Sequence, residues 1–185
     1  MIMAPYHVVL VHFPVALWTT AALVILVRAL SDGPLAKASD RVLVPLLFLG
    51  ALSGLAAYVV GLLVWPLETV TASPLGRNHL LAASWSLAYW TLLLITRWIQ
   101  GEAVWEGVMR WVMLGLAVLG GVLLTITGTL GGHIAGNPTA VSRVLHFLGW
   151  DVYDTFYLPD VMLWLLAAAI IALPVIGLWG SRRPA

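Results

Sequence analysis

Long apolar runs fill most of this sequence, and they constrain its fold more than any other feature. Hydrophobic residues make up 62% of the 185 residues and charged residues only 9%, and the mean hydropathy is +1.00. A bilayer core about 30 Å thick needs roughly 20 apolar residues for each helical crossing. The runs predict five transmembrane helices, at about 8–30, 42–67, 79–98, 111–130 and 161–179. We therefore expect an all-α integral membrane bundle that forms a single domain over residues 1–185.

The segment 138–157 has a different pattern. After Pro138, apolar residues recur at helical spacing, and Ser142, Arg143 and Asp151 lie on the opposite face. Short helices with one apolar face lie in the plane of the membrane interface. We expect one interfacial helix here, in contact with the lipid bilayer.

Lysine and arginine residues are distributed unevenly over the expected loops. Seven of the nine fall on one side of the membrane, and only Arg77 and Arg143 fall on the other. Basic loops stay in the cytoplasm. We therefore expect a multi-pass protein of the bacterial inner membrane with its N-terminus outside and its C-terminus in the cytoplasm. The first residues lack the basic leader and cleavage site of a signal peptide, so the first run is expected to remain in the protein.

Several classes of chemistry are disfavoured by what the sequence lacks. Cysteine is absent, which excludes disulfides, thiolate zinc sites, iron–sulfur clusters on this chain and c-type haem. No basic patch indicates a nucleic-acid partner. No P-loop, dinucleotide fingerprint or Ser/His/Asp arrangement is present, so we predict no catalytic residues. These absences favour a non-catalytic subunit over an enzyme that acts by itself.

All five histidines fall on the expected outer side of the membrane. His7 and His12 begin the first run, His79 begins the third, His133 ends the fourth, and His146 lies in the interfacial segment. Polar side chains at membrane depth are costly and usually functional. Neutral imidazole is a common ligand of metal ions and of haem iron. The histidines therefore predict a cofactor site at the outer face.

A b-type haem needs an axial nitrogen on each face, and two histidines from different helices beside glycine-lined grooves suit it. His12 is the first candidate ligand because it lies deepest, with His79 or His133 on the opposite face. His7 would support this site or serve a second haem, whereas His146 is expected to face solvent or lipid headgroups. The sequence thus predicts one or two haem b groups.

The opening motif His7-Val-Val-Leu-Val-His-Phe-Pro resembles the signature of an uncharacterised bacterial membrane family, domain of unknown function 2231. His79 at the start of a run and the segment Gly131-Gly-His-Ile are similar to later parts of that family, so the resemblance covers about residues 5–141. The sequence departs from the family pattern where Ala135-Gly-Asn-Pro replaces Tyr-x-His-Gly. The resemblance implies a redox-linked membrane fold and no particular reaction.

Three functions remain open from the sequence. The favoured one is a b-type haem electron-transfer subunit at the outer face of a larger respiratory or photosynthetic complex. Its partners would be other membrane subunits and a periplasmic electron carrier or quinone. The alternative is a cofactor-free membrane anchor or assembly subunit whose histidines only form hydrogen bonds. The third is a protein that binds or transports copper or another metal, which the apolar inner halves of the runs disfavour.

Overall fold

The computed structural model describes residues 4–154, 164, 165, 167, 168, 170–172 and 175. Four long helices form the body of the molecule: α1 (Ala4–Leu30), α3 (Leu43–Val64), α5 (Pro74–Gln100) and α6 (Gly107–Ile134). The shorter elements are α2 (Pro34–Asp40), α4 (Leu67–Thr71), the 3-10 helix η1 (Gly101–Trp105) and α7 (Val141–Phe147). Every regular element within the described residues is a helix, as the sequence predicted.

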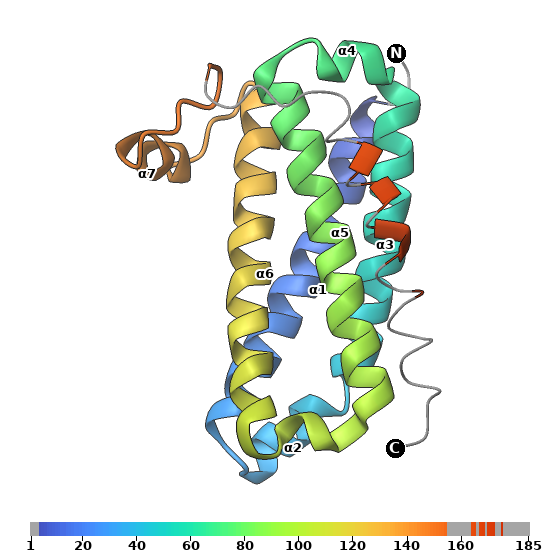
Figure 1. Cartoon of the computed structure of the whole chain (residues 1–185), viewed down its shortest axis with the longest axis vertical. Coiled ribbons are helices and arrows are strands. Elements are labelled where there is room, and N and C mark those ends of the chain that lie inside the picture. Colours follow the sequence, from blue (N-terminus) through green and yellow to red (C-terminus); the bar gives the residue numbers. More distant parts are fainter. Residues whose placement is uncertain (1–3, 155–163, 166, 169, 173–174, 176–185) are drawn as a thin grey trace.

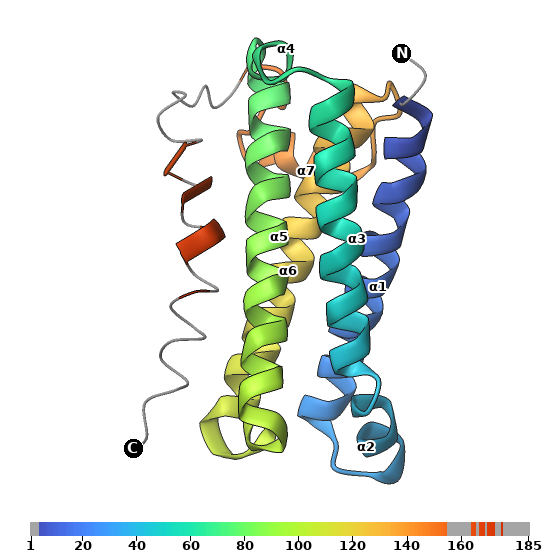
Figure 2. The same cartoon turned by 90° about the vertical axis from the view of Figure 1, so that its right-hand side faces the viewer.

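The four long helices stand side by side and alternate in direction along the bundle (Figure 1). Helix α1 packs on α3 and α6, and α5 packs on the same two helices, so α1 and α5 lie diagonally opposite each other. A second view shows the same upright arrangement (Figure 2). We call the end of the bundle that holds His7 and His79 the histidine end, and the end that holds Arg28 and Arg97 the charged end.

All four long helices are long and apolar enough to cross a membrane. Their outward faces carry large apolar side chains: Leu23, Leu63 and Val118 are each more than half exposed. Apolar surface on this scale suits contact with lipid tails. The structure therefore agrees with a multi-pass membrane protein. The expected fifth helix at 161–179 falls largely outside the described residues.

Two helices extend beyond the apolar runs that predicted them. Helix α5 begins at Pro74 rather than near residue 79, because proline is well tolerated in the first helical turn. The Ser73 hydroxyl oxygen accepts a hydrogen bond from the Gly76 N–H at 3.1 Å and caps this start. Helix α6 likewise spans 107–134 rather than 111–130. An apolar run shows which residues can contact lipid. The bounds of the helix lie further out, where capping residues end it.

The middle of the bundle is filled by two tryptophans. Trp18 of α1 and Trp90 of α5 stack face to face, with ring centroids 5.6 Å apart and planes inclined by 7°. Gly50 and Gly54 of α3 leave room for Trp18, since a Cβ atom on Gly50 would lie 2.4 Å from the indole Nε1. Aromatic packing therefore sets the distance between the diagonal helices.

Ion pairs close the charged end. The Arg97 guanidinium donates to Asp40 Oδ2 at 2.7 Å and to Glu102 Oε1 at 2.9 Å. Arg97 and Asp40 are both buried, and Asp40 belongs to α2, within the link that the sequence marked only as polar. A buried pair of charges needs this geometry because desolvation is costly. It fastens α2 to the end of α5.

A second set of ion pairs lies at the surface of the same end. Asp32 accepts hydrogen bonds from Arg28 and from Arg110 Nη2, the latter at 2.8 and 2.9 Å. The hydrogen bond from Arg28, followed by that from Arg110, holds the pKa of the Asp32 carboxyl below its usual value. These contacts tie α1 to α6.

The interfacial segment is helical over a shorter stretch than the sequence predicted. Helix α7 covers 141–147 rather than 138–157, and Gly149 lies beyond its end with φ of +84°. Such left-handed glycines are common where helices stop. Helix α7 leaves the bundle sideways at the histidine end (Figure 1), with Val144 and Phe147 exposed and Leu145 buried. Residues 155–157 of the predicted segment lie outside the described residues.

Candidate functional site

His7 of α1 is held against α3. Its Nδ1 lies 2.9 Å from the carbonyl oxygen of Ala57, and its ring touches Gly61, where a Cβ atom would lie 2.8 Å from the imidazole Cε1. Trp65 meets the ring edge-on, with centroids 5.4 Å apart. A carbonyl oxygen only accepts, so Nδ1 carries the proton and donates it. This tautomer leaves a lone pair on Nε2.

His79 of α5 is held against α6 in the same way. Its Nδ1 donates to the carbonyl oxygen of Thr127 at 3.2 Å, and its ring touches Gly131, where a Cβ atom would lie 3.0 Å from Cε1. In both cases the accepting carbonyl precedes the glycine by four residues, which is about one helical turn. The Nε2 atom of His79 therefore also keeps its lone pair.

The similarity between α1 and α5 continues for three turns beyond each histidine. Trp18 follows His7 by eleven residues, and Trp90 follows His79 by eleven. Eleven residues make about three helical turns, so each histidine lies above a tryptophan on the same face, roughly 16 Å away.

The partner helices repeat the same spacing. Gly50 precedes Gly61 on α3 by eleven residues, and Gly120, which touches Trp90, precedes Gly131 on α6 by eleven. The hairpin of α1 with α3 and the hairpin of α5 with α6 thus share one internal pattern, although their sequences differ elsewhere.

The repeat brings His7 and His79 together at one end of the bundle. They come from the two diagonal helices α1 and α5, and each lies near the same end of its helix. Both side chains are partly buried. Within the described ranges, no hydrogen bond engages Nε2 of either ring. The site therefore presents two imidazole nitrogens with free lone pairs, each fixed from behind by a backbone carbonyl.

The interior just below the two histidines is polar. The Tyr58 hydroxyl donates to Ser84 Oγ at 2.8 Å, and the Ser86 hydroxyl donates to Thr127 Oγ1 at 2.9 Å. Further along the bundle the interior becomes apolar, beginning with the stacked tryptophans. These hydroxyl pairs link α3 to α5 and α5 to α6, as hydrogen bonds between helices commonly do in membrane bundles.

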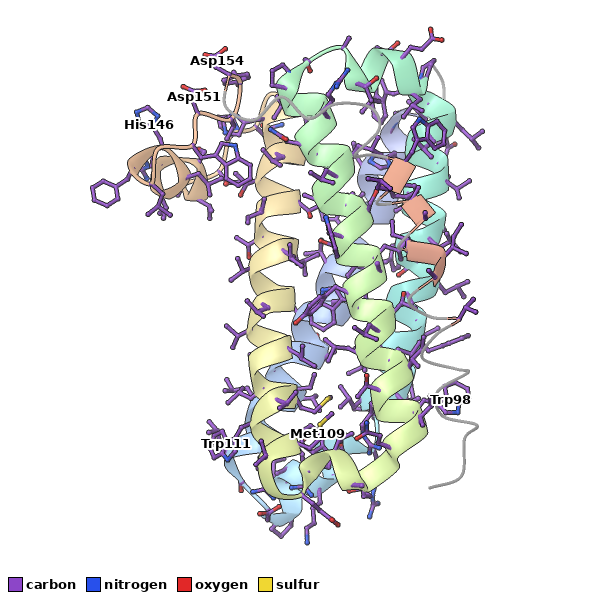
Figure 3. All side chains as sticks on the ribbon, viewed as in Figure 1. Trp98, Met109, Trp111, His146, Asp151 and Asp154 are labelled. Carbon is purple, nitrogen blue, oxygen red and sulfur yellow. The ribbon has the colours of Figure 1, made fainter. Side chains whose placement is uncertain are left out.

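The other predicted histidines do not join this pair. His12 is exposed, and its Nδ1 donates to the carbonyl of Val8 in its own helix at 2.6 Å. His146 is exposed on α7, which projects away from the bundle (Figure 3). His133 of α6 contacts Tyr153 instead, at 3.0 Å between Nδ1 and the hydroxyl oxygen.

The donor set favours some cofactors over others. No group of three or more His, Cys, Asp or Glu side chains suited to a metal ion occurs in the described part of the chain. Protein-bound zinc and copper ions usually take three or more protein ligands. A b-type haem takes two axial ligands because the porphyrin supplies the other four. His7 and His79 offer that number of imidazole nitrogens.

Comparisons with known proteins found no match. No protein-family model, no curated protein and no solved structure is significantly similar to the chain. The resemblance of the opening motif to the domain of unknown function 2231 family therefore stays a prediction.

Proposed function

We propose that this protein is a membrane-embedded b-type haem electron-transfer subunit in which His7 and His79 would hold the haem. The proposal rests on the similar contacts of the two rings. Each ring donates its Nδ1 proton to a backbone carbonyl of the neighbouring helix and keeps the lone pair on Nε2. Metal-ligating histidines nearly always donate their second ring N–H in this way, which fixes the tautomer and makes the ligand more basic.

Glycines and the stacked tryptophans bound the region between the two rings and the middle of the bundle. Gly61 and Gly131 have no side chains, so the imidazoles of His7 and His79 lie directly against the backbones of α3 and α6. Trp18 and Trp90 close the interior about three turns below. If His7 and His79 both held the haem group, it would supply one-electron transfer rather than a binding place for substrate at the metal.

The rival functions explain less of this geometry. The anchor function does not explain why two histidines, two glycines and two carbonyl acceptors recur with one spacing. A copper site needs more donors than the two imidazoles, and the described residues bring no such group together. Both rivals nevertheless predict a protein that carries no haem, so a spectrum distinguishes them from the proposal.

The histidine end is assigned to the outer side of a bacterial inner membrane. Most lysines and arginines lie toward the charged end, which favours the cytoplasm for that end. In this orientation α7 lies in the outer interface, 161–179 forms a fifth crossing, and the chain works beside other membrane subunits of a respiratory or photosynthetic complex. Electrons then enter or leave at the periplasmic face.

The proposal is tested by a dithionite-reduced minus oxidised visible spectrum of the purified protein in detergent. We expect a sharp b-type band and, by pyridine haemochrome assay, one haem per chain. A featureless spectrum from protein produced with adequate haem would reject electron transfer and favour the anchor function.

Gly61→Ala is expected to weaken haem binding without unfolding the bundle. The new methyl group meets the imidazole of His7, which has to move and loses its bond to Ala57. Loss of such a supporting hydrogen bond typically costs about 10–100-fold in metal affinity. Haem titration measures the change. Gly128→Ala is the control, since nothing lies within 4 Å of its Cβ position; equal affinity of the two variants would contradict this role for Gly61.

A further inference from the structure

An apolar groove lies between α3 and α5, near the middle of the bundle. Its volume is about 280 Å³, and it is lined by Ala51, Leu52 and Leu55 of α3 and by Leu87, Ala88 and Thr91 of α5. The Thr91 hydroxyl donates to the carbonyl of Leu87 in its own helix at 2.7 Å, so the groove presents an almost wholly apolar surface. Helix α3 belongs to the first hairpin and α5 to the second. The groove therefore follows the seam between the two hairpins.

One further residue lines the groove, and it comes from the far end of the chain. Ile170 belongs to the apolar run 161–179, and every described residue of that run is helical. Ala167 and Ile170 are partly buried, whereas Trp164 and Ile171 are each more than half exposed. Residues three apart lie on one face of a helix. The run therefore turns the face that carries Ala167 and Ile170 toward the bundle, on the side formed by α3 and α5 (Figures 1 and 2).

The depths of the run and of the groove agree. Ile170 is the central residue of the run 161–179, and Leu87 is the central residue of α5. An apolar run of about 20 residues that crosses the bilayer has its centre near the midplane. Helix α5 crosses the same bilayer, so its centre lies near the midplane too. Position in the sequence thus puts Ile170 at the level of the groove.

Small side chains allow a helix to approach this seam closely. Ala51 and Ala88 line the groove, and Ala167 lies on the face of the run that turns toward it. Small residues are enriched where helices pack against each other in membranes, because they let the backbones come close together. The groove and the run therefore carry complementary sides of a contact between transmembrane helices.

The run is linked to the bundle by enough residues to reach the groove of its own chain. Nine residues separate Asp154, which lies at the histidine end (Figure 3), from Trp164. Nine extended residues span at most about 30 Å. Packed helices lie about 8–10 Å apart, so this link is long enough to pass over two of them. A second copy of the chain is not needed to fill the groove.

We propose that the run 161–179 packs in the groove between α3 and α5 of its own chain and clamps the two hairpins together. This inference builds on the fifth crossing proposed above and gives that crossing its place in the bundle. Ile170 enters the groove, and Ala167 lies about one turn nearer the histidine end. His7 and His79 belong to different hairpins, so a clamp across this seam also limits their separation.

Crosslinking of the full-length protein in membranes tests the contact. The chain has no cysteine, so a pair of introduced cysteines provides the only thiols. Ile170→Cys is combined with Leu55→Cys on α3 or with Thr91→Cys on α5, and the protein is treated with a short bis-maleimide. A protease site inserted at Asn137, which is exposed between α6 and α7, separates the two thiols along the chain. Fragments that stay joined on a denaturing gel after cleavage report the crosslink.

The control pair is Ile170→Cys with Val122→Cys, because Val122 is exposed on α6, outside the groove. We expect joined fragments for the groove pairs and separate fragments for the control pair. Separate fragments for both groove pairs, or equal joining in the control pair, would overturn the proposal. A product of twice the chain mass would also overturn it, because the run would then fill the groove of a second copy. This readout needs no cofactor, so a protein without haem would reject the function proposed above and leave the crosslinking result unaffected.

The clamp itself is tested by thermal unfolding of Ile170→Ala and Ile171→Ala in detergent, followed by circular dichroism. The two substitutions remove the same atoms from adjacent residues, but Ile170 lines the groove and Ile171 is 70% exposed. Truncating a packed side chain leaves a cavity. We expect a lower midpoint temperature for Ile170→Ala and little change for Ile171→Ala, and equal midpoints would contradict the clamp.

Discussion

His7→Ala and His79→Ala are each expected to lose the six-coordinate haem b spectrum, whereas His12→Ala keeps it. Each of the first two substitutions removes one of the two nitrogens that the site presents. Losing even a supporting partner of a metal ligand costs roughly 10–100-fold in affinity, so losing a ligand should cost at least as much. Haem content per chain after purification, together with the reduced spectrum, measures the effect.

His12→Ala is a closely matched control for this prediction. It removes the same side chain from the same helix, five residues further along, at a position exposed on the outside of the bundle. The overall fold should remain intact in all three variants, because none of these histidines belongs to the buried core. Loss of haem in His12→Ala with retention in His7→Ala would contradict the assigned pair.

Asp40→Ala is expected to destabilise the bundle strongly without touching the histidine end. Asp40 is 3% exposed and pairs with the buried guanidinium of Arg97. Removing one partner leaves a buried charge without its main counter-ion, and such losses cost about 3–5 kcal/mol. Glu102 still contacts Arg97 at 2.9 Å but is largely exposed, so it replaces little of this interaction.

Thermal unfolding in detergent, followed by circular dichroism, measures this effect. Glu68→Ala serves as the control, since that carboxylate is exposed on α4. We expect a clear fall in midpoint temperature for Asp40→Ala and almost none for Glu68→Ala. Equal midpoints would show that the ion pair at the charged end contributes little.

The long helices were predictable from sequence because the requirement for a crossing is local. The length and hydropathy of an apolar run can be read directly from the sequence. The first four runs each coincide with a helix. The ends of the helices were harder to predict. Pro74 and the cap at Ser73 start α5 about one turn before its apolar run begins, since helix starts depend on backbone hydrogen bonds rather than on hydropathy.

The sequence predicts a cofactor site among these histidines, but it does not indicate that His7 rather than His12 packs against the neighbouring helix. The sequence ranked His12 first by depth along the helix, whereas contact depends on direction around it. His7 and His12 point about 140° apart on an α-helix. Only the packing of α1 on α3 decides which of them turns inward, and it seats His7 on Gly61.

A signal for the pair is nevertheless present in the sequence. His7 with Trp18 and His79 with Trp90 share one spacing, and the glycines that receive them share it too. Hydropathy alone does not reveal this repeat, because the residues between the matching positions differ.

The most direct test of the central claim is a titration of haem into the purified protein prepared without it, followed at the Soret band and by electron paramagnetic resonance of the ferric form. If His7 and His79 ligate one haem, the titration ends at one equivalent per chain and the iron is low-spin and six-coordinate. An end point at two equivalents, a high-spin five-coordinate iron, or no binding would contradict the claim.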